Sequence, residues 1–109
     1  MACDNTKRLN SQKNIMNITE KSDNYVITKN DNERTIVCTK ATAGTVTLPL
    51  LSENIGRIIT IVRTGNGAIV VSGTDGETIG TASSYTLASK GATITVQALA
   101  TDWIIISEI

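Results

Sequence analysis

The chain contains no histidine and no phenylalanine, and its 109 residues include one proline and two cysteines. Histidine is the most common general acid and base and a frequent metal ligand, so its absence argues against hydrolytic catalysis and against a zinc site. The aromatic residues are Tyr25, Tyr85 and Trp103. Because so few rings are present, Ile, Val and Leu must fill the core.

Charge of either sign is not in excess, since ten basic and ten acidic residues cancel. Binding to nucleic acid or to a membrane surface needs a cationic field or an amphipathic face, so we expect neither partner. No apolar run has the length of a signal sequence or a membrane span. These observations favour a protein that is made in the cytoplasm.

Motifs for chemistry are also missing. Cys3 and Cys38 lack the paired spacing of a metal site, and we expect Cys38 to be a buried thiol. Asp75 and Glu77 lie beside a glycine and are read as a turn, and Asn30–Glu33 lacks the spaced acidic pattern of a calcium loop. The sequence predicts no catalytic site, no metal site and no cofactor, and therefore a protein that is not an enzyme.

The chain divides into a polar N-terminal arm, residues 1–24, and a β-rich domain, residues 25–109. The domain consists of short β-branched runs separated by turn residues, which predicts an all-β fold of short antiparallel strands. The arrangement expected is a sandwich or a trimeric interwoven β structure. Pro49 marks a sheet edge or a strand end, and Gly65-Asn66-Gly67 predicts a tight antiparallel hairpin.

Alternation along the strands predicts which faces are buried. In residues 92–98, Ala92, Ile94, Val96 and Ala98 share one face, which is typical of a half-buried strand. In residues 58–62 and 103–106 both faces are apolar, and one small domain has little interior to cover them. We therefore predict a subunit interface, with a monomeric β-sandwich as the alternative. The interface residues predicted are Ile58, Ile59, Ile61, Val62, Ile104 and Ile106.

A set of short motifs resembles the C-terminal modules of bacteriophage tail fibres, tailspikes and head fibres. These motifs, spread over residues 35–108, are Leu48-Pro49, the Asn54, Gly56 and Arg57 group, Ile79-Gly80, and the terminal strand Trp103–Ile106. The resemblance implies a homotrimer in which strands of three chains surround one axis. The chain shows no long shaft and no coiled-coil heptads, which favours a short virion protein such as a head fibre or capsid decoration protein.

The polar arm is expected to attach this domain to the major capsid protein or another virion protein. Its apolar and basic side chains would make the contact; they are Lys7, Arg8, Leu9, Lys13, Ile15, Met16 and Ile18. An alternative function is the receptor-binding tip of a tail fibre, which would recognise host surface glycans. A polysaccharide depolymerase would need clustered acidic residues on a longer body. Trimer against dimer stays open at this point.

Overall fold

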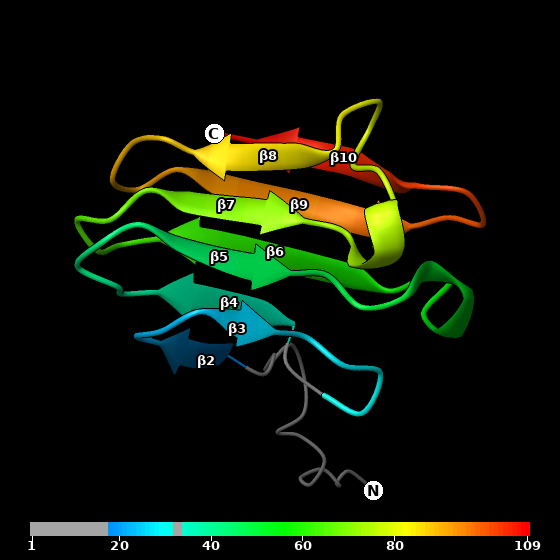
Figure 1. Cartoon of the computed structure of the whole chain (residues 1–109), viewed down its shortest axis with the longest axis horizontal. Helices are drawn as coiled ribbons and strands as arrows, with labels where there is room; N and C mark the ends of the chain where they lie inside the picture. The colour runs from blue at the N-terminus through cyan, green and yellow to red at the C-terminus, as the bar shows by residue number, and fades with distance from the viewer. Residues whose placement is uncertain (1–17, 32–33) are drawn as a thin grey trace, which may run out of the picture.

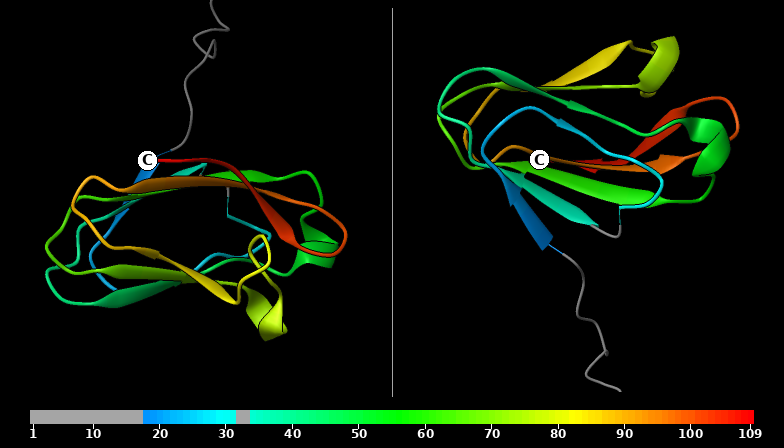
Figure 2. Two further views of the ribbon diagram at one scale, coloured as in Figure 1. Left: turned by 90° about the horizontal axis from the view of Figure 1, so that it is seen from above. Right: turned by 60° about the horizontal axis from the view of Figure 1, so that its bottom comes forward.

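The computed structural model describes residues 18–31 and 34–109, which form two mixed β-sheets facing each other (Figures 1 and 2). The five-stranded sheet contains, in spatial order, β10 (Trp103–Glu108), β9 (Thr93–Ala98), β6 (Ile58–Arg63), β4 (Thr35–Cys38) and β2 (Ile18–Lys21). The four-stranded sheet contains β3 (Tyr25–Val26), β5 (Gly44–Thr47), β7 (Ile69–Ser72) and β8 (Ser84–Leu87). Two short 3-10 helices, η1 (Leu51–Glu53) and η2 (Thr74–Gly76), lie in the connections. No α-helix occurs in the described residues, and the all-β class is confirmed.

Strands β2 to β7 alternate between the two sheets. β2, β4 and β6 pair in parallel in one sheet, and β3, β5 and β7 pair in parallel in the other. The later strands reverse direction, with β8 antiparallel to β7, β9 antiparallel to β6 and β10 antiparallel to β9. The prediction of antiparallel strands is therefore wrong for the pairing of β2 to β7 with one another, and it is correct for the pairs that β8, β9 and β10 form. Alternation reports which face of a strand is buried, and it carries no information on strand direction.

The predicted hairpin at Gly65-Asn66-Gly67 is also wrong, because this turn carries the chain from β6 to β7 in the opposite sheet. This turn packs directly against the backbone of the turn between β4 and β5. Gly67 N–H donates to the carbonyl of Lys40 at 3.0 Å, and a Cβ added to Gly67 would lie 1.8 Å from the carbonyl oxygen of Thr42. Glycine is needed here because two backbones approach closely.

The core lies between the sheets and is built from aliphatic ladders. Ile36, Ile61 and Ile94 are neighbours across β4, β6 and β9, and all three are fully buried. The alternation predicted for β9 is confirmed, since Ile94, Val96 and Ala98 are buried while Thr93 and Gln97 are half-buried. Trp103 is the largest buried side chain, and most of the remaining core residues are Ile, Leu and Val.

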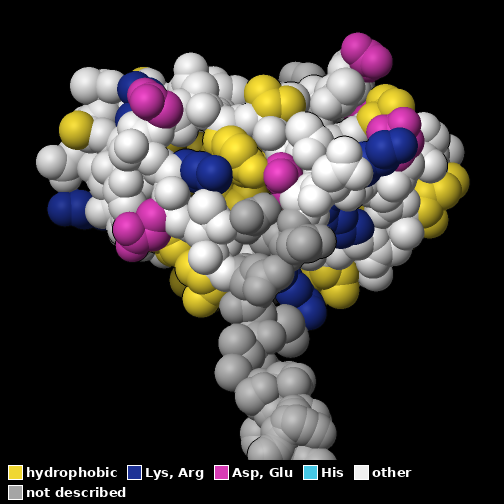
Figure 3. Space-filling model, turned by 90° about the horizontal axis from the view of Figure 1, so that it is seen from below, with side chains coloured by type: hydrophobic (Ala, Val, Ile, Leu, Met, Phe, Trp, Pro, Cys, Tyr) yellow, Lys and Arg dark blue, Asp and Glu magenta, His cyan; other side chains and the backbone are white. Residues whose placement is uncertain are grey.

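The boundary between arm and domain differs from the prediction. Ile18–Lys21, assigned to the arm, forms edge strand β2, which pairs with β4 in parallel. The arm residues Lys7, Arg8, Leu9, Lys13, Ile15 and Met16 lie outside the described residues. Ile18 is 64% exposed at this end of the stack, where hydrophobic and charged side chains are interspersed (Figure 3). Lys21 places its amine over the ring of Tyr25, 4.0 Å from the centroid.

Candidate functional site

Strand β6 presents one of its two apolar faces to the core. Ile59 and Ile61 are fully buried between the sheets, so the interface prediction is wrong for these two residues. Their cover comes from the four-stranded sheet, where Val46 and Val71 point inward. The sequence did not predict this cover, because the second sheet is built by parallel pairing of strands that are distant in sequence. Ile58 and Val62, on the opposite face of β6, are half-buried.

Several of the remaining predicted interface residues share the outward side of the five-stranded sheet. Ile58 pairs with Gln97, which in turn pairs with Ile104, so these three form one row across β6, β9 and β10. Ile106 lies at the register shift of β10 and is 49% exposed. We call the outward residues of β4, β6, β9 and β10 the outer face: Thr35, Val37, Ile58, Thr60, Val62, Thr93, Thr95, Gln97, Ile104 and Ser107.

The outer face carries no charged side chain on these four strands, but the edge strand β2 continues the same side of the sheet with Ile18 beside Thr35 and the exposed Glu20 beside Val37. Thr60 and Thr95 satisfy each other through a hydroxyl hydrogen bond of 2.9 Å, and Val37 lies beside Val62. Contact with another protein would therefore bury methyl groups and paired hydroxyls without stripping water from an ion. Sequence reasoning missed Val37, Thr60 and Thr95, because the strand pairing that brings them together has no local signal.

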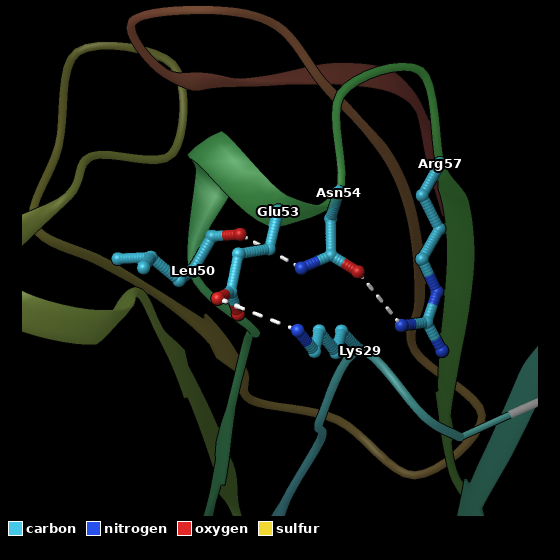
Figure 4. Close-up of polar contacts among 5 residues, drawn as sticks. All are labelled: Lys29, Leu50, Glu53, Asn54 and Arg57. Atoms are coloured by element: carbon cyan, nitrogen blue, oxygen red, sulfur yellow. Dashed lines mark hydrogen bonds and ion pairs between the residues drawn. The ribbon is translucent and has the colours of Figure 1, made fainter.

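The Asn54, Gly56 and Arg57 motif serves the body of the fold (Figure 4). Asn54 donates from its amide to the carbonyl of Leu50 at 2.7 Å and accepts a hydrogen bond from Arg57 at 3.0 Å. Gly56 has a φ of 90°, which favours glycine. Arg57 also donates to the backbone carbonyls of Thr28 and Asp31, at 2.9 Å each. The motif therefore ties the segment before β6 to the loop between β3 and β4.

The other motif residues also have structural positions. Leu48 is fully buried, and Pro49 follows the end of β5, which confirms the strand-end prediction. Ile79 is buried and forms a β-bridge to Trp103, while Gly80 donates to the carbonyl of Trp103 at 2.6 Å. The motif residues therefore lie at turns and in the core of the fold.

Metal-ligating side chains and the thiol of Cys38 are candidate sites of chemistry in the part of the chain that the structure describes. Within residues 18–31 and 34–109, no cluster of three His, Cys, Asp or Glu side chains could hold a metal ion. Cys38 is a buried free thiol, as predicted, and burial raises its pKa to about 11, which suppresses the reactive thiolate at neutral pH. None of the helices in this part of the chain is long and apolar enough to cross a bilayer.

Comparison with known proteins adds no relative: no family model matches the sequence, and no curated protein matches it significantly.

Proposed function

We propose that the chain is a non-enzymatic structural protein of a bacteriophage virion, a homotrimeric head fibre or capsid decoration protein. The observation that carries the proposal is the uncharged outer face, from which Ile58, Val62 and Ile104 project. The resemblance of the turn and core motifs to phage fibre modules gives the class. The basic and apolar residues of the N-terminal segment provide the attachment to a capsid protein.

The outer face suits contact between identical chains. Its β-branched side chains lose little rotamer entropy when they pack, and over β4, β6, β9 and β10 it lacks charges that would repel their copies around a symmetry axis; the charge of Glu20 lies beyond β4, on the edge strand β2. A stable interface buries roughly 800 Å² on each partner. Three long strands, β6, β9 and β10, supply a continuous surface for such packing, and the bulged end of β10 adds the exposed Ile106.

The mass of the protein in solution tests the assembly. Light scattering after size exclusion should give three times the chain mass of 11.6 kDa. Ile58→Glu places a charge on the outer face and should yield a folded monomer, whereas Leu99→Glu, at a residue 39% exposed outside that face, should keep the trimer. A monomeric unmodified chain at micromolar concentration would refute the assembly.

A second experiment tests residence in the particle. Antibodies against the β domain should label intact particles of the phage that encodes the chain. Deletion of residues 1–17 keeps β2 and should leave a trimer with nearly unchanged Tm that no longer enters particles. Normal occupancy of the truncated trimer would place attachment in the β domain, and absence of the full chain from purified particles would refute the virion role.

A receptor-binding tip that recognises host glycans is the second candidate function. It is favoured by Tyr85, a half-buried ring that lines a surface pocket together with hydroxyl-bearing side chains. Glycan binding separates the two candidates, because a coat protein has no need of it.

A further inference from the structure

A surface pocket of about 420 Å³ opens beside the turn between β8 and β9. This volume falls in the range of small-molecule sites. The pocket is lined by one aromatic ring, two hydroxyl side chains, one amine and small apolar groups. The lining residues are Tyr85, Thr86, Ala88, Ser89, Lys90, Gly91, Ala92 and Ile109.

The turn that forms one wall is held by backbone hydrogen bonds. Ala92 N–H donates to the carbonyl of Ser89 at 3.0 Å, and Gly91 N–H donates to the carbonyl of Arg63 in β6 at 2.7 Å. Gly91 has a φ of 88°, the left-handed conformation that glycine favours at the third position of a tight turn. Lys90, at the second position, is therefore presented from a fixed backbone.

The ring of Tyr85 is positioned from both sheets. Its hydroxyl donates to the carboxylate of Glu108, which joins β8 of one sheet to β10 of the other. This hydrogen bond is the main cause that raises the pKa of Tyr85. The ring also packs against the core cluster. A ring fixed in this way offers an apolar wall to a ligand at little entropic cost.

Charged side chains of both signs lie at the pocket: Lys90 belongs to the lining, and the carboxylate of Glu108 accepts the hydrogen bond of the Tyr85 hydroxyl. Lys90 is exposed and contributes the one charged side chain of the lining, and no lining side chain is acidic. Within residues 18–31 and 34–109 the recorded ion pair joins Lys29 and Glu53, and Lys90 takes part in none. An amine of this kind is available to pair with a carboxylate from outside, through a charge-assisted hydrogen bond.

We propose that this pocket binds a sugar residue that carries a carboxylate, such as a uronic acid. The carboxylate pairs with Lys90, the sugar hydroxyls exchange hydrogen bonds with Ser89, and the apolar face of the pyranose lies on the ring of Tyr85. The proposal concerns the single chain and does not depend on the trimer. Binding of the sugar would favour the receptor-binding tip over the coat role, whereas absence of binding would leave the coat role unaffected.

Amide NMR titration of the full chain tests the pocket. The probes are galacturonic acid, a galacturonate oligosaccharide, and galactose as the neutral control. The acidic sugars should shift the amides of residues 85–92, and galactose should shift them far less at equal concentration. Tighter binding of the oligosaccharide would indicate a polysaccharide as the natural source, while equal affinity would indicate a single sugar. Both results support the site.

Variants test the charge contact with Lys90 and the need for the Tyr85 hydroxyl. Lys90→Gln should weaken binding of galacturonate about tenfold, as expected for a lost charge-assisted bond. Lys29→Gln, in the loop that follows β3 at the far end of the stack (Figure 1), should not. Ala88→Glu, at an exposed position, should abolish binding by repulsion. Tyr85→Phe keeps the ring and should still bind. Equal shifts with galactose, or no shift with millimolar galacturonate, would overturn the proposal.

Discussion

Arg63 is a buried cation that closes one end of the core. It lies in β6, points inward and is 8% exposed. Its guanidinium donates to the backbone carbonyls of Gly65 at 3.1 Å, Asn66 at 2.7 Å and Leu87 at 3.2 Å. Leu87 belongs to β8 in the opposite sheet. One side chain therefore joins the two sheets and fixes the turn that leaves β6.

Replacement of Arg63 by Met should destabilise the fold while nearly preserving side-chain volume. A hydrogen bond to a charged group contributes about 1.5–3 kcal/mol, and the bond to Leu87 is buried. The other two acceptors are partly solvated, so water recovers part of their loss. The expected cost is about 2–4 kcal/mol, a large part of the usual 5–15 kcal/mol stability of a domain. At roughly 4 °C per kcal/mol, Tm should fall by about 8–16 °C.

Thermal and urea unfolding followed by circular dichroism measure this effect. Arg63→Lys keeps the charge but cannot reach all three carbonyls, and its Tm should lie between those of the unmodified chain and Arg63→Met. Lys90→Met, at an exposed position of the neighbouring turn, serves as the control and should change stability by less than about 0.5 kcal/mol. If Arg63→Met unfolds at the same temperature as the unmodified chain, burial of methionine offsets the lost bonds and the reasoning is refuted.

Three further predictions follow from local geometry. Gly67→Ala should lower Tm strongly, since the new Cβ would clash with the Thr42 carbonyl. A Tm within about 2 °C of that of the unmodified chain, which corresponds to roughly 0.5 kcal/mol, would contradict the close approach of the two turns. Cys38 should resist iodoacetamide at pH 8 until urea unfolds the chain, because its pKa is about 11; mass spectrometry of the native protein checks this. Hydrogen bonds from the Tyr25 hydroxyl and the Thr28 amide lower the pKa of Asp31. Its stabilisation is therefore complete above the unfolded-state pKa and is lost as pH falls through the lower folded-state value, so Asp31→Asn should reduce the acid slope of stability measured by urea unfolding.

Local patterns in the sequence predicted the structure correctly where one face of a strand is exposed to solvent and the other face is buried. The alternation around Ile94 and Val96 assigned the faces of β9 correctly, and Pro49 correctly marked the end of β5. Such signals lie within a few residues of one another, so they can be read without knowing the rest of the fold.

Strand direction and sheet membership were beyond those local signals. Gly65 and Gly67 look like hairpin residues, but they are small because the turn lies on the backbone of the preceding turn. The sequence also did not indicate which of the two apolar faces of β6 is buried in the core. Only the parallel pairing of β5 with β7 shows that Ile59 and Ile61 are covered within the chain while Ile58 is not. Similarly, the Tyr85 pocket needs the meeting of β8 with the end of β10, which are far apart in sequence.

The parallel order of the strands has a consequence for how the chain folds. Ile18 pairs with Thr35, and Thr35 pairs with Thr60, so each partner strand arrives after the chain has crossed to the other sheet and back. Closing such loops costs entropy before any ladder is complete. Ala98 and Trp103, by contrast, pair across a short loop. We expect β9 and β10 to nucleate folding and the parallel strands to add toward β2, so that during synthesis the first strands to leave the ribosome are the last to find their partners.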